Sequence, residues 1–198
     1  MNISQHINSI FNSNTYLIED KAYDYCWLID IGDTDYLIDK SLNIKGIFIT
    51  HSHFDHIYGI NEILEKNCDC KIYISEYGKN ALFSDKLNMS KYHGTPLICN
   101  SDNICVINDG DKIDLYPNNT LNVIATPGHC PSCLTYYTDN YIFTGDSYIP
   151  DIKVVTNLPK GNKIQAQESL ERIKELAKNR IIYPGHGEIK TPFYVQTT

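Results

Sequence analysis

The sequence has no hydrophobic segment long enough to cross a membrane and no excess of basic residues. Its apolar runs fall well short of the roughly 18 residues that a membrane-spanning helix needs. The N-terminus begins MNISQHINSI, without a basic stretch followed by an apolar one, so no signal peptide is predicted. Acidic residues outnumber basic ones by 24 to 17, giving a net charge of −7. A protein that mainly binds nucleic acid usually has a basic surface. We therefore expect a cytoplasmic protein with a small-molecule substrate and neither a nucleic acid nor a membrane as partner.

The chain also lacks a regular cysteine framework, an internal repeat and a linker. Its seven cysteines are an odd number with irregular spacing, which indicates free thiols in a reducing compartment. The content of 42% hydrophobic and 21% charged residues is typical of a folded globular protein. The length of 198 residues predicts one domain over residues 1–198 with a substantial core. The sequence leaves the oligomeric state open.

Many short apolar, β-branched runs alternate with a few helical patterns. The segments predicted as strands are residues 14–19, 26–32, 46–50, 71–75, 104–109, 121–126, 134–138, 141–145 and 180–184. Helices are predicted over 56–66 and 163–178, the second capped by Asn162, and residues 76–91 are expected to be helical or irregular. This pattern indicates sheets covered by helices.

Metal-capable side chains follow four of these predicted strands. GIFIT leads into the stretch His51, Ser52, His53, Phe54, Asp55, His56, and the other three sites are His129, Asp146 and His186. Strand ends at one edge of a sheet can bring such residues together. His51 and His53, two apart in an extended segment, point to the same side and can share one ion. Asp55 and His56 come where the chain turns and can serve a second ion, and Asp146 could bridge the two. Imidazole and carboxylate are good ligands for zinc and similar metals.

These motifs resemble those of the metallo-β-lactamase superfamily, in its glyoxalase II-like branch. The matching pieces are H-S-H-F-D-H at 51–56, T-P-G-H at 126–129, F-T-G-D at 143–146 and Y-P-G-H at 183–186, in the family's order. The resemblance implies a mixed α/β fold, a four-layer αβ/βα sandwich. It further implies that His51, His53 and His129 hold one metal, that Asp55, His56 and His186 hold the other, and that Asp146 is shared. Zinc is favoured for both divalent ions, with iron or manganese as alternatives.

Such a centre is typical of hydrolysis. Two metals about 3.5–4 Å apart can share a water and supply hydroxide near neutral pH. We predict a hydrolase acting on a small ester, thioester or lactone, with Asp55 orienting the nucleophile or accepting its proton. Two alternatives remain: an oxidoreductase resembling the persulfide dioxygenases, which use one iron, and a metal-binding module without turnover.

Two departures from the glyoxalase II pattern make glutathione a doubtful part of the substrate. The Gly-Cys-Gly-Arg/Lys stretch that follows the shared aspartate in that branch is replaced here by residues 147–155, S-Y-I-P-D-I-K-V-V. The sequence also has only twelve residues after His186, where that branch carries a helical C-terminal domain.

A few further residues are candidates for supporting roles. Asp30, in the segment Leu-Ile-Asp-Ile-Gly, is expected either beside the metal ligands or in a turn. Tyr148 and Lys153 follow Asp146 and could contact an anionic part of the substrate. The C-x-x-C formed by Cys130 and Cys133 is interpreted mainly as small filling residues, although its oxidation could disturb His129.

Overall fold

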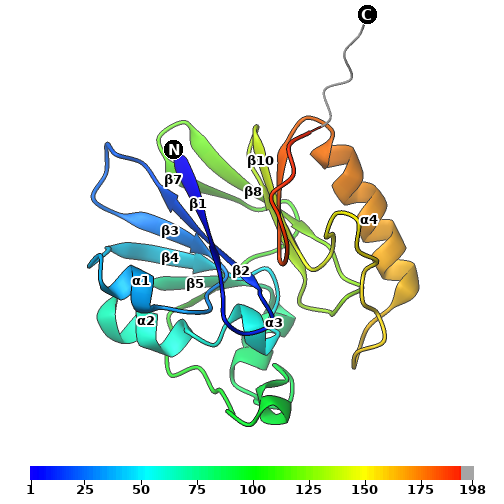
Figure 1. Cartoon of the computed structure of the whole chain (residues 1–198), viewed down its shortest axis with the longest axis horizontal. Coiled ribbons are helices and arrows are strands. Elements are labelled where there is room, and N and C mark those ends of the chain that lie inside the picture. Colours follow the sequence, from blue (N-terminus) through cyan, green and yellow to red (C-terminus); the bar gives the residue numbers. More distant parts are fainter. Residues whose placement is uncertain (193–198) are drawn as a thin grey trace, which may run out of the picture. The chain divides into compact units, whose positions relative to one another are not determined.

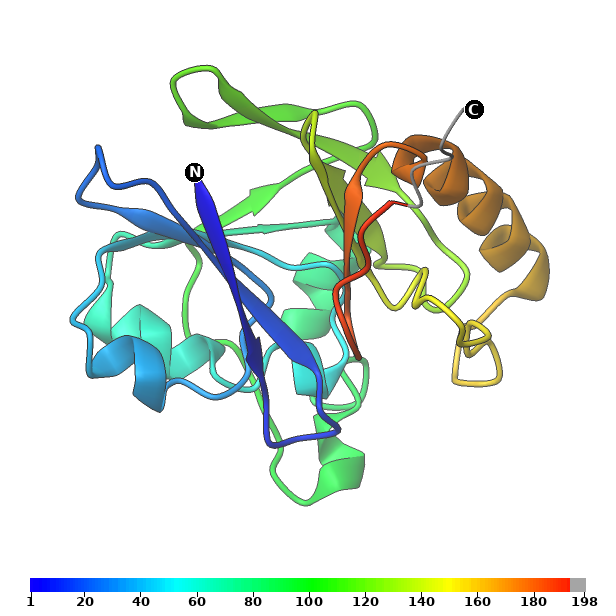
Figure 2. The same ribbon diagram turned by 45° about the horizontal axis from the view of Figure 1, so that its top comes forward.

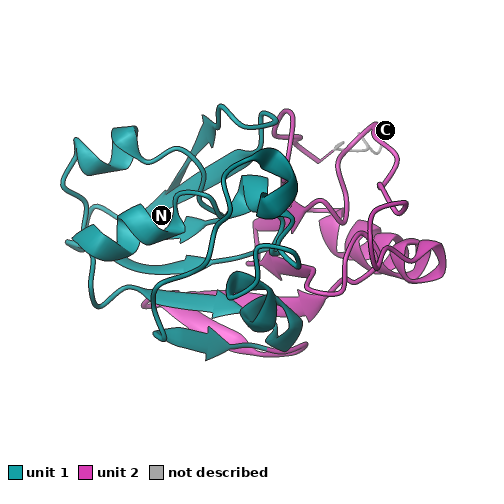
Figure 3. Ribbon diagram, turned by 90° about the horizontal axis from the view of Figure 1, so that it is seen from below, with its two compact units in different colours: residues 1–107 teal, residues 108–198 magenta. Residues whose placement is uncertain are grey.

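The structure, a computed structural model, describes residues 1–192. The chain divides into two compact units, residues 1–107 and residues from 108 onward, which Figure 3 shows in separate colours. The single-domain prediction over 1–198 stays a prediction, and its last six residues lie outside the described part. Within the described part, every helix is too short or too polar to cross a bilayer.

Unit 1 is built on a six-stranded sheet whose spatial order follows the chain. Its strands are β1 (Asn2–Ile7), β2 (Asn14–Glu19), β3 (Cys26–Ile29), β4 (Ile44–Phe48), β5 (Lys71–Ile74) and β6 (Ile104–Val106). The first three strands pair antiparallel and the remaining pairs are parallel. The helices are α1 (Asp35–Ile38), α2 (Ile60–Lys66) and α3 (Glu76–Leu82), with 3₁₀ turns η1 (Phe54–His56) and η2 (Ser90–His93). Figures 1 and 2 show α1, α2 and α3 on one face of this sheet.

The strands β2, β3 and β4 of unit 1 are largely buried on both faces, as their apolar runs predict. Leu28, Ile47 and Ile72 face the helices and join a cluster with residues of α2. On the opposite face, the rings of Phe48 and Tyr73 stack at 4.6 Å. The segment 49–56 leaves the sheet at the carboxyl end of β4. Because β3 runs parallel to β4, its carboxyl end lies at the same edge of the sheet.

Unit 2 is built on a five-stranded sheet with α4 (Lys163–Ala177) packed against it. The strands lie in the order β11 (Ile181–Pro184), β10 (Tyr141–Gly145), β9 (Leu134–Tyr137), β8 (Asn119–Ala125) and β7 (Lys112–Tyr116). β10 and β11 pair in parallel, and the other neighbouring strands in this order pair antiparallel. Ile173 and Ala177 of α4 pack with Ile124 and Ile142 of the sheet. Figure 1 shows this long helix running along the unit.

The structure differs from the sequence predictions at four elements. The polar β1, the partly exposed β7 and the short α1 were not predicted. The predicted helix over 56–66 is wrong at its start, because residues 54–56 form a 3₁₀ turn and α2 begins only at Ile60. Between them the chain pairs with Ile31, whose N–H donates to the His56 carbonyl (2.9 Å). This pairing, and the close approach of Gly59 to the Gly32 carbonyl, prevents the helix from extending backwards.

Gly128 fixes the distance between the end of β8 and the start of α4. The Asn162 side chain caps α4 by accepting from the N–H groups of Ile164 and Gln165, as predicted. The Asn162 backbone N–H donates to the Gly128 carbonyl (2.8 Å). A Cβ on Gly128 would lie 2.2 Å from the backbone nitrogen of Ala166, and the residue has φ of +136°. Only glycine permits this contact and this backbone conformation.

Gly128→Ala should therefore destabilise the protein by about 2–4 kcal/mol, because both backbone strain and a backbone clash are introduced. Gly110→Ala is the matched control: Gly110 also has positive φ (+89°) but has open space around it, so only about 1 kcal/mol is expected. Urea unfolding measures both. Equal losses of unfolding free energy in the two variants would show that the close approach of α4 to Gly128 adds nothing to the cost of the substitution.

Candidate metal centre

In unit 1, the predicted ligands lie together on the segment that follows β4. The rings of His51 and His53 are 4.7 Å apart and those of His51 and His56 are 4.2 Å apart. His51, His53 and His56 are all buried. Asp55 adds a carboxylate whose Oδ2 is 3.4 Å from Nε2 of His56. Four potential ligands therefore occur within one short turn of the chain.

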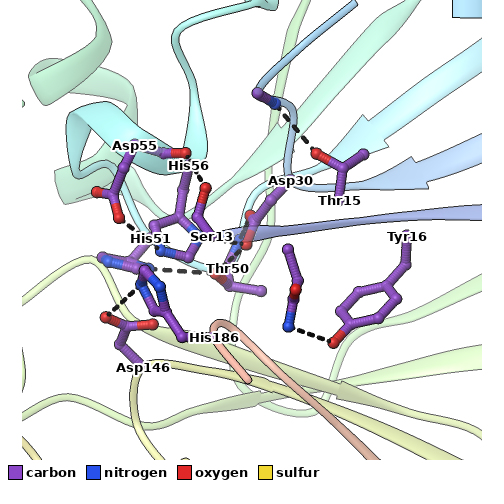
Figure 4. Close-up of polar contacts among 12 residues, drawn as sticks. Ser13, Thr15, Tyr16, Asp30, Thr50, His51, Asp55, His56, Asp146 and His186 are labelled. Carbon is purple, nitrogen blue, oxygen red and sulfur yellow. Dashed lines mark hydrogen bonds and ion pairs between the residues drawn. The ribbon is translucent and has the colours of Figure 1, made fainter. Parts of the chain in front are cut away.

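Asp30 supports this cluster from the end of β3. Its carboxylate accepts hydrogen bonds from the backbone N–H and the hydroxyl of Thr50, both at 2.7 Å. Oδ2 also lies 2.8 Å from Nδ1 of His56, and Figure 4 shows these contacts. A carboxylate only accepts, so Nδ1 of His56 carries the proton and Nε2 keeps a lone pair for a metal. Burial raises the pKa of the Asp30 carboxyl, while His56 and Thr50 act in the opposite direction.

The predicted role of Asp30 beside the ligands stays a prediction, but the contacts that such a role requires are present. Asp30 also has a positive φ of +55°, so the alternative turn role describes its backbone. The two interpretations are compatible, because the turn is what directs the carboxylate towards Thr50 and His56.

The loop between β1 and β2 holds the same ligand segment from another direction. The hydroxyl of Ser13 donates to the backbone carbonyl of Asp55 at 2.6 Å, as Figure 4 shows. Ser13 and Thr50 were missed in the sequence analysis. Thr50 stands directly before His51, and its small hydroxyl side chain at a strand end was the available signal. Nothing in the sequence linked Ser13 to Asp55, 42 residues away.

In unit 2, three predicted ligands follow three strands of the sheet. His129 comes after β8, Asp146 after β10 and His186 after β11. Oδ2 of Asp146 lies 3.6 Å from Nε2 of His129 and 3.4 Å from Nε2 of His186. Figure 4 shows Asp146 and His186 side by side. One carboxylate oxygen thus faces both imidazoles.

Backbone groups of unit 2 orient these ligands. The Val155 carbonyl lies 2.8 Å from Nδ1 of His129 and, as an acceptor, leaves Nε2 with its lone pair. The Gly185 N–H donates to the Gly145 carbonyl (2.9 Å), which ties the Asp146 and His186 segments together. Sequence analysis missed the contribution of Val155, because a backbone carbonyl has no residue-type signal.

The distances between ligand atoms match those of a metal site better than those of direct ion pairs. Charge-assisted hydrogen bonds are about 2.7–2.9 Å long. Two ligand atoms, each about 2.1 Å from one tetrahedral ion, are instead about 3.4 Å apart. The His56–Asp55, His129–Asp146 and His186–Asp146 distances are 3.4, 3.6 and 3.4 Å. The residues therefore fit a divalent metal by donor chemistry and by spacing.

The structure thus brings the seven predicted ligands together in two groups, four within unit 1 and three within unit 2. Sharing of ions between the groups, as the sequence analysis expected, stays a prediction. The two predicted substrate-contact residues lie elsewhere in unit 2. Tyr148 and Lys153 line a hollow beside α4, and their predicted substrate contacts also stay predictions.

The cysteine pair after His129 is compact and buried. The Sγ atoms of Cys130 and Cys133 are 3.2 Å apart, and both residues are free thiols. Burial raises the pKa of the Cys133 thiol, and the neighbouring Cys130 adds to this rise. Both side chains occupy space inside unit 2, as the interpretation as filling residues requires.

If Asp30 supports the ligand cluster, Asp30→Asn should weaken zinc binding about 10–100-fold, the usual effect of losing a hydrogen-bond partner of a metal-binding histidine. Asn has nearly the same volume but a neutral acceptor. Asp33→Asn is the matched control, because Asp33 contacts Ser9 and Tyr58 instead of a predicted ligand. Competition titration with a chromophoric chelator gives both affinities. Unchanged zinc binding in Asp30→Asn would leave Asp30 with a turn role only.

The chain is similar to known proteins over most of its length. The model of the metallo-beta-lactamase superfamily matches residues 9–186. A hydroxyacylglutathione hydrolase of Tolumonas auensis is 27% identical over 182 residues, covering 85% of this chain and 63% of that protein. The probable metallo-hydrolase YqgX of Bacillus subtilis is 29% identical over 181 residues, covering 87% of this chain and 83% of that protein. The chain thus spans less than two thirds of the first of these relatives.

A solved structure shows the fold. The crystal structure of the BLEG-1 B3 metallo-beta-lactamase aligns with a TM-score of 0.84 and 24% identity, over 96% of this chain and 94% of that one. The predicted metallo-β-lactamase fold, with one helix-covered sheet in each unit, is confirmed. The family match covers nearly all of the chain and includes all seven predicted ligands. The chain belongs to the metallo-β-lactamase superfamily.

Proposed function

We propose that this protein hydrolyses a small ester, thioester or lactone, and that its two ligand groups share two divalent ions. His51, His53 and His129 would hold one ion, and Asp55, His56 and His186 the other. Asp146 would contact both. The proposal is supported by family membership and by the complete set of motifs in the family's order. Zinc is the proposed metal, and imidazole and carboxylate ligands also accept iron or manganese.

The position of Asp146 carries this proposal. Its Oδ2 atom faces the Nε2 atoms of His129 and His186, two histidines assigned to different ions, at 3.6 and 3.4 Å. A carboxylate in that position is suited to a shared ligand. Histidines that served only the packing of unit 2 would instead be expected at direct hydrogen-bond distances from the carboxylate.

The residues of the chain supply orientation and proton transfer. Bound ions of this kind supply hydroxide near neutral pH and stabilise the oxyanion that forms on the substrate. Asp55 would orient the attacking oxygen or accept its proton, and its backbone is held by Ser13 (2.6 Å). Asp30 would keep Nδ1 of His56 protonated. In this scheme no serine or cysteine of the chain acts as a nucleophile.

The substrate is proposed as a small molecule, without nucleic acid or membrane partner. Thioesters belong in the test because one relative is named hydroxyacylglutathione hydrolase. We do not propose glutathione as the recognised group. The segment 147–155 lacks the Gly-Cys-Gly-Arg/Lys stretch that the resembling branch uses for it.

Asp146→Ala tests the proposal directly. The variant should lose most bound metal and most activity together, because a ligand of both ions is removed. Elemental analysis of protein purified without chelators gives the metal content, and a panel of esters, thioesters and lactones gives the activity. Asp139→Ala, in the exposed turn between β9 and β10, is the matched control and should keep both.

The same measurements separate the alternatives. About two zinc ions per chain with turnover of the panel supports the binuclear hydrolase. One iron per chain with persulfide oxidation would replace it by a dioxygenase. Metal without any turnover would leave a binding module. Full retention of metal and activity in Asp146→Ala would refute the shared role of this residue.

A further inference from the structure

Unit 2 contains a cavity that includes none of the seven predicted metal ligands. It has a volume of about 500 Å³ and lies between the segment 148–156 and α4. Its lining residues are Tyr148, Ile149, Asp151, Ile152, Lys153, Val154, Thr156, Lys163, Ala166, Gln167, Leu170 and Lys174. All of them belong to unit 2, so the cavity is formed within a single compact unit. Its volume is within the usual range of small-molecule sites.

One stripe of α4 forms a wall of this cavity. Lys163, Gln167, Leu170 and Lys174 are spaced by four, three and four residues, which places them on one helical face. The two lysines stand at the ends of this stripe and the leucine lies between them. Ile173 and Ala177 occupy a neighbouring stripe and pack into the sheet. The packing of α4 against the sheet therefore uses this neighbouring stripe and not the lysine-bearing face.

The charge at the cavity is positive although the protein as a whole is acidic. Lys153, Lys163 and Lys174 line it, and Asp151 is the single acid among the lining residues. The Asp151 carboxylate already pairs with Lys190 at 3.5 Å. Three ammonium groups thus remain around one hollow of a chain with net charge −7. An anion would be attracted to this lysine-bearing lining.

Part of the cavity lining is apolar. Ile149, Val154 and Leu170 line it, and Ile152, another lining residue, is 55% exposed. The Tyr148 ring forms another part, with Nζ of Lys174 5.9 Å from its centre. A lining with both apolar and cationic side chains suits a molecule with an apolar body and an anionic head.

The segment opposite α4 is held in place by hydrogen bonds. The Thr144 hydroxyl donates to the Tyr148 carbonyl (2.5 Å), and the Ile152 N–H donates to the Ile149 carbonyl (3.1 Å). Further along, the Val155 carbonyl is held by His129 (2.8 Å). A wall fixed at several points needs little ordering when a ligand binds, which favours affinity.

We infer that this cavity binds a small amphiphilic anion: an aromatic or aliphatic body carrying one carboxylate, phosphate or sulfonate. The head group would sit at the lysine-bearing edge of the cavity, and the body would contact Leu170 and the isoleucines. This site goes beyond the proposed hydrolase activity. It does not depend on bound metal, because no predicted ligand lines it.

A fluorescence titration with 8-anilinonaphthalene-1-sulfonate tests the inference. This probe has an aromatic body and one sulfonate, and its emission rises in apolar surroundings. Saturable binding to one site per chain is expected in the metal-free and the metal-loaded protein alike. Lys163→Gln/Lys174→Gln should weaken binding about ten-fold, because two of the three cations lining the cavity are lost.

Two controls make the result specific. Lys112→Gln/Lys160→Gln removes the same charge from exposed positions of unit 2 outside the cavity and should leave the affinity unchanged. The uncharged analogue N-phenyl-1-naphthylamine has the same rings without the sulfonate and should bind much more weakly. Thermal unfolding verifies that both double variants are folded. Equal affinity in the two double variants, or equal binding of the uncharged analogue, would overturn the inference.

Discussion

The arrangement of unit 1 depends on one buried carboxylate. Asp30 is only 2% exposed, and a charged group so far from water is stable only when its oxygens are hydrogen-bonded. Thr50 and His56 provide those bonds, so the chain that leaves β4 must return to the end of β3. This return is what brings the ring of His51 beside that of His56. The left-handed backbone of Asp30, which costs on the order of 1 kcal/mol, persists because these contacts hold it there.

Unit 2 positions its ligands by other means. His129 is oriented by a backbone carbonyl, that of Val155, and not by a carboxylate. Asp146 and His186 are aligned because β10 and β11 run parallel and end at the same edge of the sheet. Gly128 lets α4 approach to within contact distance just before His129. These supports are properties of backbone geometry, so substitutions far from the ligands in sequence can disturb the centre.

This difference explains which features the sequence could predict. The seven predicted ligands were singled out because metal-capable side chains recur directly after apolar strands. Most strands and α4 were predicted from their apolar runs and periodicity. The strand β1 was missed because its exposed and half-buried residues carry no apolar alternation. The early start predicted for α2 failed because the pairing of His56 with Ile31 overrides a local helical pattern. Ser13 could not be predicted, because its hydroxyl contacts the backbone carbonyl of Asp55, which is far away in the sequence. Val155 could not be predicted, because it contacts His129 through its backbone carbonyl.

The lysines of the cavity beside α4 are another feature that the sequence could predict only in part. Lys153 could be singled out from its place after Asp146, but Lys163 and Lys174 look like ordinary exposed helix residues. They line a cavity only because the segment 148–156 lies along that face of α4. The segment is fixed in part because the Val155 carbonyl holds His129. One stretch of backbone therefore forms a wall of the cavity and orients a predicted metal ligand. A substitution that loosens this stretch would weaken both sites, whereas removing a lysine from the cavity edge would affect only one.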